Sequence, residues 1–279
     1  MEPTLVMFNY EERRVLIWGK THPELSSNYV ETVCTGGVLE DGRPVRLYPI
    51  PYRYLEGDQK FGNYQWITAG IVKDQRDARP ESHRLDKGSI TVGDKVEPTK
   101  DEWGSRAEYI FKFSGWQFDS MEDLAAAQAY GGTSLGIVTP KEIIKISEKV
   151  RPDDDRIAFE KKFEDLRIEN EAKRAQNTLF DDIPVPEFKK LAFVSSRLEV
   201  HWRCYGPNCN THHCQALDWG VQELLRKAGV DAAKEKLEDI CNLDRYNLKF
   251  FMGNIKAHPM NFSIVGLWHP KKETTPRLF

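Results

Sequence analysis

Residues 29–55 are YVETVCTGGVLEDGRPVRLYPIPYRYL, and this stretch predicts the fold of the N-terminal half. Two apolar and aromatic runs flank Glu40–Arg43, which predicts a hairpin turn because Gly42 can take a positive φ. Outside this stretch, similar short runs recur between Gly, Pro and Asp residues as far as about residue 150. Strands at such spacing indicate a β-barrel, so an OB-like β-barrel domain is expected over residues 1–150.

One short helix is expected inside this segment. Ser120 is a capping residue and Asp123 follows it at the acidic third position of a capping box, which is typical of a helix start. Gly131 and Gly132 predict its end.

A connecting segment is predicted over residues 151–190. Residues 151–176 are charged and lack glycine, which favours a solvated connecting helix over a partner-binding coiled coil, because clean heptads are absent. Pro184 and Pro186 then exclude a regular strand and indicate a linker.

The remaining residues, 191–279, begin with a strand and pass a cluster of Cys and His residues. Two predicted helices and two strands follow. This order indicates a small zinc-ribbon-like α+β domain, so the whole chain is expected to be α+β.

Composition limits the classes of function. The chain has 279 residues, 40% of them hydrophobic, which is enough for a packed core. Residues 197–279 carry 12 basic and 9 acidic side chains, whereas residues 1–150 carry 19 and 23, so a surface for nucleic acid must be local. No apolar stretch approaches the 18 or so residues that cross a bilayer, and no secretory signal is visible. A cytoplasmic protein without a membrane partner is expected.

A metal site is predicted where three of the five cysteines and two histidines lie within eleven residues. Zinc takes four sulfur and nitrogen ligands in a tetrahedral arrangement. The expected ligands of a structural zinc ion are Cys204, Cys209, Cys214 and either His212 or His213. Free buried cysteines and an open catalytic site with three ligands are the alternatives.

Cations alternate with aromatic residues in the barrel segment, a composition suited to stacking single-stranded bases while neutralising phosphates. Arginine forks also suit phosphate recognition. The predicted nucleic-acid-binding residues are Arg46, Tyr48, Tyr52, Arg53, Arg79 and Arg84. Two alternatives remain open, a solvated loop in which the arginines pair with Asp77 and Glu81, and an aromatic barrel rim.

A possible partner-binding peptide follows the charged helix. Residues 176–180, QNTLF, resemble the QxxLF peptide by which bacterial DNA-associated proteins bind the sliding clamp. The resemblance implies that Leu179 and Phe180 enter an apolar pocket while Gln176 donates or accepts a hydrogen bond. Alternatively, the two apolar side chains fix the linker to one of the domains.

Two longer stretches carry a family resemblance. Residues 20–55 resemble the opening of bacterial proteins with dual OB-fold modules, and residues 250–270 resemble the end of bacterial proteins from mobile or defence-associated neighbourhoods. The resemblance implies DNA or RNA binding through Arg46 and its strand, as an accessory or recognition component of a DNA-processing or antiviral (phage) defence system. The Cys/His cluster and the charged helix depart from the dual pattern.

Two other functions remain open. A metal-dependent nuclease or other nucleic-acid hydrolase would need an acid–base set near the metal, for which the candidates are Asp218, Glu223, His201, His258 and Lys256. An adaptor recruited by the sliding clamp is the second alternative. The sequence contains no phosphate loop and no HExxH helix, so it does not decide whether the protein is an enzyme.

Overall fold

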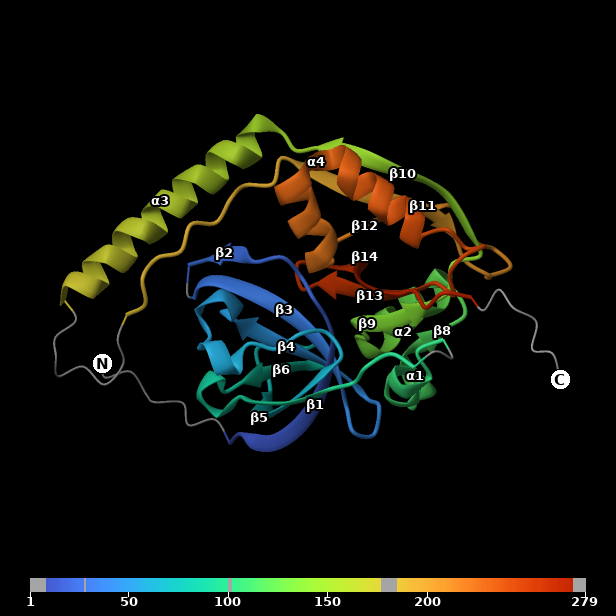
Figure 1. Cartoon of the computed structure of the whole chain (residues 1–279), viewed down its shortest axis with the longest axis horizontal. Helices are drawn as coiled ribbons and strands as arrows, with labels where there is room; N and C mark the ends of the chain where they lie inside the picture. Colours follow the sequence, from blue (N-terminus) through green and yellow to red (C-terminus); the bar gives the residue numbers. More distant parts are fainter. Residues whose placement is uncertain (1–8, 28, 100–101, 177–184, 273–279) are drawn as a thin grey trace.

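The chain folds as an α+β protein with an N-terminal β-barrel and a C-terminal α+β part (Figure 1). The computed structural model describes residues 9–27, 29–99, 102–176 and 185–272. Four α-helices lie within these residues, and none of them is long and apolar enough to span a membrane. The predicted fold class is confirmed.

The barrel has five strands and is closed. In order around it they are β1 (Glu11–Lys20), β3 (Val30–Leu39), β4 (Pro44–Ile50), β6 (Ser82–Leu85) and β5 (Gln65–Lys73), and β5 pairs again with β1. The barrel is mixed, because β4 and β6 run parallel and the other neighbours run antiparallel. The short strands β2 (Glu24–Ser26) and β7 (Thr91–Lys95) extend it beside β3 and β5.

The predicted hairpin turn joins β3 to β4. The amide of Leu39 donates to the carbonyl of Arg43 over 2.9 Å, and Gly42 has a φ of 85°. An L side chain rarely takes that conformation, so glycine at this turn fixes the register of the two strands.

Two further sheets form the C-terminal part. One contains β14 (His258–Trp268), β13 (Lys249–Ile255), β9 (Leu135–Val138) and β8 (Gln117–Phe118), and the other contains β10 (Glu142–Val150), β11 (Ser196–Arg203) and β12 (His212–Gln215). The helices are α1 (Gly104–Ile110), α2 (Met121–Gly131), α3 (Asp153–Gln176) and α4 (Trp219–Ile240). Short 3-10 helices occupy Tyr52–Tyr54, Gly57–Gln59, Lys87–Ser89 and Ser114–Trp116.

Residues 117–150 pair with strands that lie far ahead in the sequence. Strand β9 pairs with β13, and β10 pairs with β11. The sequence analysis assigned these residues to the barrel domain, because a short strand has the same pattern whichever sheet it joins. The structure therefore places β8, β9 and β10 in the C-terminal sheets, and Leu124 of α2 packs in the core of the same part.

The second half of strand β1, residues 15–20, is buried on both faces and joins the barrel to the C-terminal part. Val15 and Ile17 point into the barrel core, and Trp18 points the other way. The Trp18 ring stacks on Phe251 of β13, with centroids 4.6 Å apart. Gly36 makes room for this indole, since a Cβ there would lie 2.1 Å from a Trp18 ring carbon.

Helix α3 and the returning chain form an arch over the barrel (Figure 1). The arch leaves the C-terminal part after β10 and returns to it at β11, and the amide of Arg151 donates to Ser195 where the two ends meet. Phe163 of α3 packs against Phe188 of the returning chain, with ring centroids 5.0 Å apart. We use the term strap for residues 151–176, which include α3, together with residues 185–197, the last two of which begin β11.

A buried lysine and an aspartate lie at the junction of barrel and C-terminal part. The Lys20 ammonium donates to the carbonyl of Phe61 over 2.7 Å. Asp218 caps α4 by accepting from the amide of Val221. Burial lowers the pKa of Lys20 to about 8 and raises the pKa of Asp218 to about 6, and the attraction between the two charges opposes both shifts.

Replacing Asp218 with Asn keeps a capping oxygen and removes the titrating carboxyl. Because the folded pKa of about 6 lies above the ordinary 3.8, the folded protein holds a proton that the unfolded chain releases between these values. Wild-type stability should therefore lose up to about 3 kcal/mol from this group as the pH rises from about 4 to about 6. Urea unfolding should show Asp218→Asn gaining stability relative to wild type over that range. If the free energy of unfolding depended on pH in the same way in Asp218→Asn and in wild type, the raised pKa of Asp218 would be contradicted.

Candidate functional site

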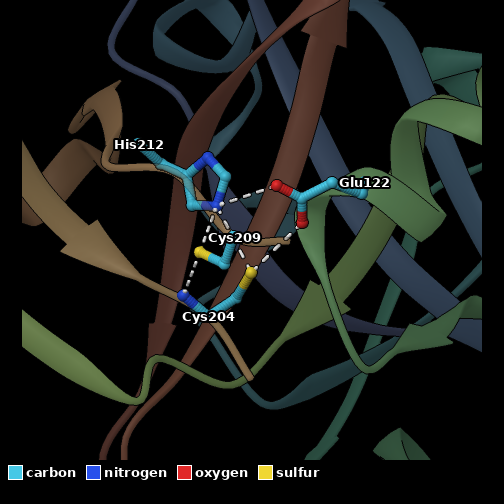
Figure 2. A group of neighbouring side chains, drawn as sticks. All are labelled: Glu122, Cys204, Cys209 and His212. Atoms are coloured by element: carbon cyan, nitrogen blue, oxygen red, sulfur yellow. Dashed lines mark hydrogen bonds and ion pairs between the residues drawn. The ribbon is translucent and has the colours of Figure 1, made fainter. Parts of the chain in front are cut away.

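Four potential metal ligands converge between α2 and the β11–β12 loop (Figure 2). They are Glu122, Cys204, Cys209 and His212, and their ligand atoms all lie within 4.8 Å of one another. Cys204 Sγ lies 3.3 Å from His212 Nε2 and 3.3 Å from a Glu122 oxygen, and Cys209 Sγ lies 3.2 Å from the same nitrogen. A tetrahedral ion with ordinary Zn–S and Zn–N bonds separates such ligands by about 3.6 Å. The cluster could hold a metal ion.

Local structure fixes these ligands in place. Ser120 caps α2 by accepting from the amide of Asp123, which sets Glu122 in the first turn of the helix. The loop approaches this turn closely at Gly206, where a Cβ would lie 2.8 Å from Ser120 and 3.1 Å from Glu122. The amide of Cys209 donates to the carbonyl of Gly206, which folds the loop back toward α2.

Burial shifts the pKa values of two of the four ligands, Cys204 and His212. Burial raises the pKa of Cys204 to about 11, so this thiol is protonated at neutral pH without a cation. Burial also lowers the pKa of His212, which favours the neutral imidazole that a metal requires. A bound cation would stabilise the thiolate form.

Cys214, which the sequence analysis included among the ligands, lies outside this group. The Sγ atom of Cys214 is not among the ligand atoms that lie within 4.8 Å of one another, although Cys214 and His212 lie only two residues apart on β12. Cys214 packs in the core of the C-terminal part instead. The neighbouring His213 contacts the ring of His201, with centroids 4.2 Å apart. Glu122 therefore completes the group with the three predicted residues of the loop.

A cavity of about 780 Å³ lies between the barrel, the strap and the C-terminal sheets. Its barrel side consists of β3 and β4 together with the loops after β1 and after β5. Its charged lining residues are Glu24, Arg46, Asp74, Arg76, Asp77, Arg79, Arg151, Asp155, Lys162, Arg197 and Lys256.

Three of the predicted nucleic-acid-binding residues line this cavity. Tyr48 is 40% exposed, so its ring is available to a ligand. Arg46 is buried and donates to Cys34 Sγ and to the carbonyl of Ser134. Arg79 forms an ion pair with Asp77 and donates to a backbone carbonyl of β13.

The other three have contacts elsewhere. Tyr52 packs edge-on against Phe61 and donates its hydroxyl to the Phe61 carbonyl. Arg53 forms an ion pair with the buried Glu31 and donates to two carbonyls of the strap. Arg84 is buried and donates to the hydroxyl of Tyr29. These contacts support the fold around the cavity.

The remaining candidates are dispersed. Leu179 and Phe180 of the clamp-like peptide lie outside the described residues, and Gln176 ends α3. In the proposed hydrolytic set, His201 lies 2.6 Å from the Ser147 hydroxyl and Lys256 donates to a carbonyl of the β5–β6 loop. Among the described residues, none of that set belongs to the metal group.

Fold and candidate site together define a protein with an N-terminal mixed barrel and a possible Cys/His/Glu metal centre. Residues 11–112 match a family model described as Domain of unknown function (DUF8758). Residues 117–279, more than half of the chain, match Domain of unknown function (DUF8757), and the chain belongs to this family. No curated protein matches the sequence.

Substitutions can show whether Glu122 or Cys214 is the fourth ligand. Cobalt(II) titration of the wild-type protein should give thiolate absorption with about one ion per chain. Cys209→Ser should lose this signal, and Glu122→Gln should weaken cobalt affinity by roughly 10-fold or more, because the exchange removes a charged ligand. Cys214→Ser is the matched control and should bind cobalt like wild type. Loss of binding in Cys214→Ser with unchanged binding in Glu122→Gln would contradict the structural assignment.

Proposed function

We propose that the protein binds DNA or RNA in the cavity over the β3–β4 face of the barrel. The observation that carries this proposal is the position of the cavity on the barrel. OB-folds bind oligonucleotides on the face of their second and third strands, between the loops that join strands one to two and four to five. Counted among the five barrel strands, β3 and β4 are the second and third.

The loops beside the cavity also correspond to the loops that OB-folds use for binding. The connection from β1 to β3 contributes Thr21, His22 and Pro23 to the cavity, and the β5–β6 loop contributes Arg76 and Arg79. The closed strand order, with β4 and β6 parallel, could be that of an OB-like barrel. The cavity therefore lies where an OB-like barrel would bind its ligand.

Charge favours this cavity over another large cavity. Seven cations and four carboxylates line it, a net charge of +3. A second cavity of about 1110 Å³ lies near the start of β1 and is lined by four Lys or Arg residues and five carboxylates, including the buried Glu81. A polyanion is attracted to the first and not to the second.

We infer that the metal of this protein is zinc in a structural role. Two thiolates, an imidazole and a carboxylate are ligands that zinc accepts. The ion would connect α2 to the β11–β12 loop, which are 82 residues apart at Glu122 and Cys204. Such a cross-link would contribute directly to folding. The role as an accessory component of a DNA-processing or defence system is supported by the sequence resemblance.

The proposed function predicts salt-dependent binding that requires the Tyr48 ring. Affinity for a single-stranded oligonucleotide should fall by roughly tenfold or more between about 50 and about 200 mM salt, because phosphate contacts release counterions. Tyr48→Ala should cost about 1–3 kcal/mol of binding free energy and leave the salt slope nearly intact, because stacking is lost. Tyr48→Phe keeps the ring and should bind like wild type. Fluorescence anisotropy measures all three.

Tyr130→Ala is the matched control, since Tyr130 is 94% exposed on α2 and does not line the cavity. It should leave affinity unchanged. Absence of binding to DNA and RNA at low salt would overturn the proposal. Equal affinities for wild type and Tyr48→Ala would exclude the β3–β4 face as the binding surface.

A further inference from the structure

The strap contributes aromatic rings and cations to the cavity. The sequence of the connecting segment, which is mostly charged, did not predict the aromatic contribution. Phe159 and Phe193 line the cavity and contact each other, with ring centroids 5.5 Å apart. The guanidinium of Arg151 lies 4.2 Å from the centroid of the Phe193 ring, and Arg197 and Lys162 lie in the same lining. Aromatic rings interleaved with cations are the combination that binds single strands.

The strap is attached to the barrel at two places, which fixes its position over the β3–β4 face. Lys162 of α3 donates to the carbonyl of Leu25 in β2 over 2.8 Å. On the returning chain, Arg53 donates to the carbonyls of Lys189 and Lys190, and Tyr54 accepts from the amide of Lys189. The strap is therefore the second wall of the cavity.

The aromatic lining of the cavity suits an unpaired strand better than a double helix. A duplex presents only the edges of its bases in its grooves, whereas an unpaired strand also exposes base faces on which aromatic side chains stack. Tyr48, Phe159 and Phe193 line the cavity, and stacking on these rings requires unpaired bases but no particular sequence.

We propose that the strap restricts the binding site to single-stranded nucleic acid, with bases held between Tyr48 of the barrel and the Phe159–Phe193 pair. This inference rests on the proposed function and adds its substrate class. Barrel and strap would contact the same strand from opposite sides, and Arg197 would neutralise a phosphate.

The test compares single-stranded and blunt duplex oligonucleotides of about 16 nucleotides, the upper end of OB-fold site sizes. Wild type should bind the single strand at least tenfold more tightly. The double variant Phe159→Ala/Phe193→Ala should lose roughly tenfold or more in single-strand affinity and little in duplex affinity. Ile157→Ala/Ile168→Ala removes two exposed apolar side chains, 55% and 54% exposed, from the outside of the same helix and should bind like wild type.

Arg197→Ala keeps the inference testable if the double variant does not fold. Its side chain is 37% exposed and lies 3.8 Å from Asp155, so its removal should leave the fold intact. It should reduce the salt slope by about 0.7, the value for one phosphate contact on a single strand. An unchanged slope would contradict a role of the strap in binding.

The outcomes distinguish the two proposals. Equal affinity for single strand and duplex, or strap variants that bind like wild type while Tyr48→Ala does not, would overturn the strap inference and leave nucleic-acid binding in place. No binding of either oligonucleotide would overturn the proposed function, and the strap inference with it.

Discussion

The burial of residues 15–20 of β1 on both faces is the constraint on which the rest of the structure depends. Its residues alternate between the barrel core and the Trp18–Phe251 stack, so one strand belongs to two hydrophobic cores. Burying both faces removes a large apolar area from water and fixes the barrel against the C-terminal sheets. The cavity lies beside this junction, because β3 pairs with β1 and β13 packs against it.

The metal group and the cavity are two separate features of this framework. Glu122, Cys204, Cys209 and His212 lie between α2 and the β11–β12 loop, and none of them lines the cavity. A metal there would stabilise the C-terminal part, because it would hold α2 and strand β12 in place. The cavity instead combines barrel, strap and C-terminal residues, so its shape depends on how these three parts are held together.

Local features were predictable from the sequence. The turn at Gly42, the Ser120 cap of α2 and the helix over Asp153–Gln176 follow from glycine conformation, capping and composition. The break of α4 at Gly229, with a φ of 86°, agrees with the two helices expected there. Non-local features were not predictable. Glu122 is 82 residues from Cys204, and only tertiary structure shows that they meet. The same reason hid Phe159, whose charged surroundings indicated a solvated helix, and Phe193, which was assigned to the first strand of the C-terminal domain.

The central claim is that a strand of nucleic acid occupies the cavity between β3–β4 and the strap. Photo-crosslinking of a 5-bromouracil-substituted single strand, followed by peptide mapping, tests this most directly, because it reports where the bases lie. The account predicts crosslinks to the peptides that contain Tyr48, Phe159 and Phe193. Crosslinks confined to the second cavity, at Glu11–Arg14, or to the loop around Cys209 would contradict it.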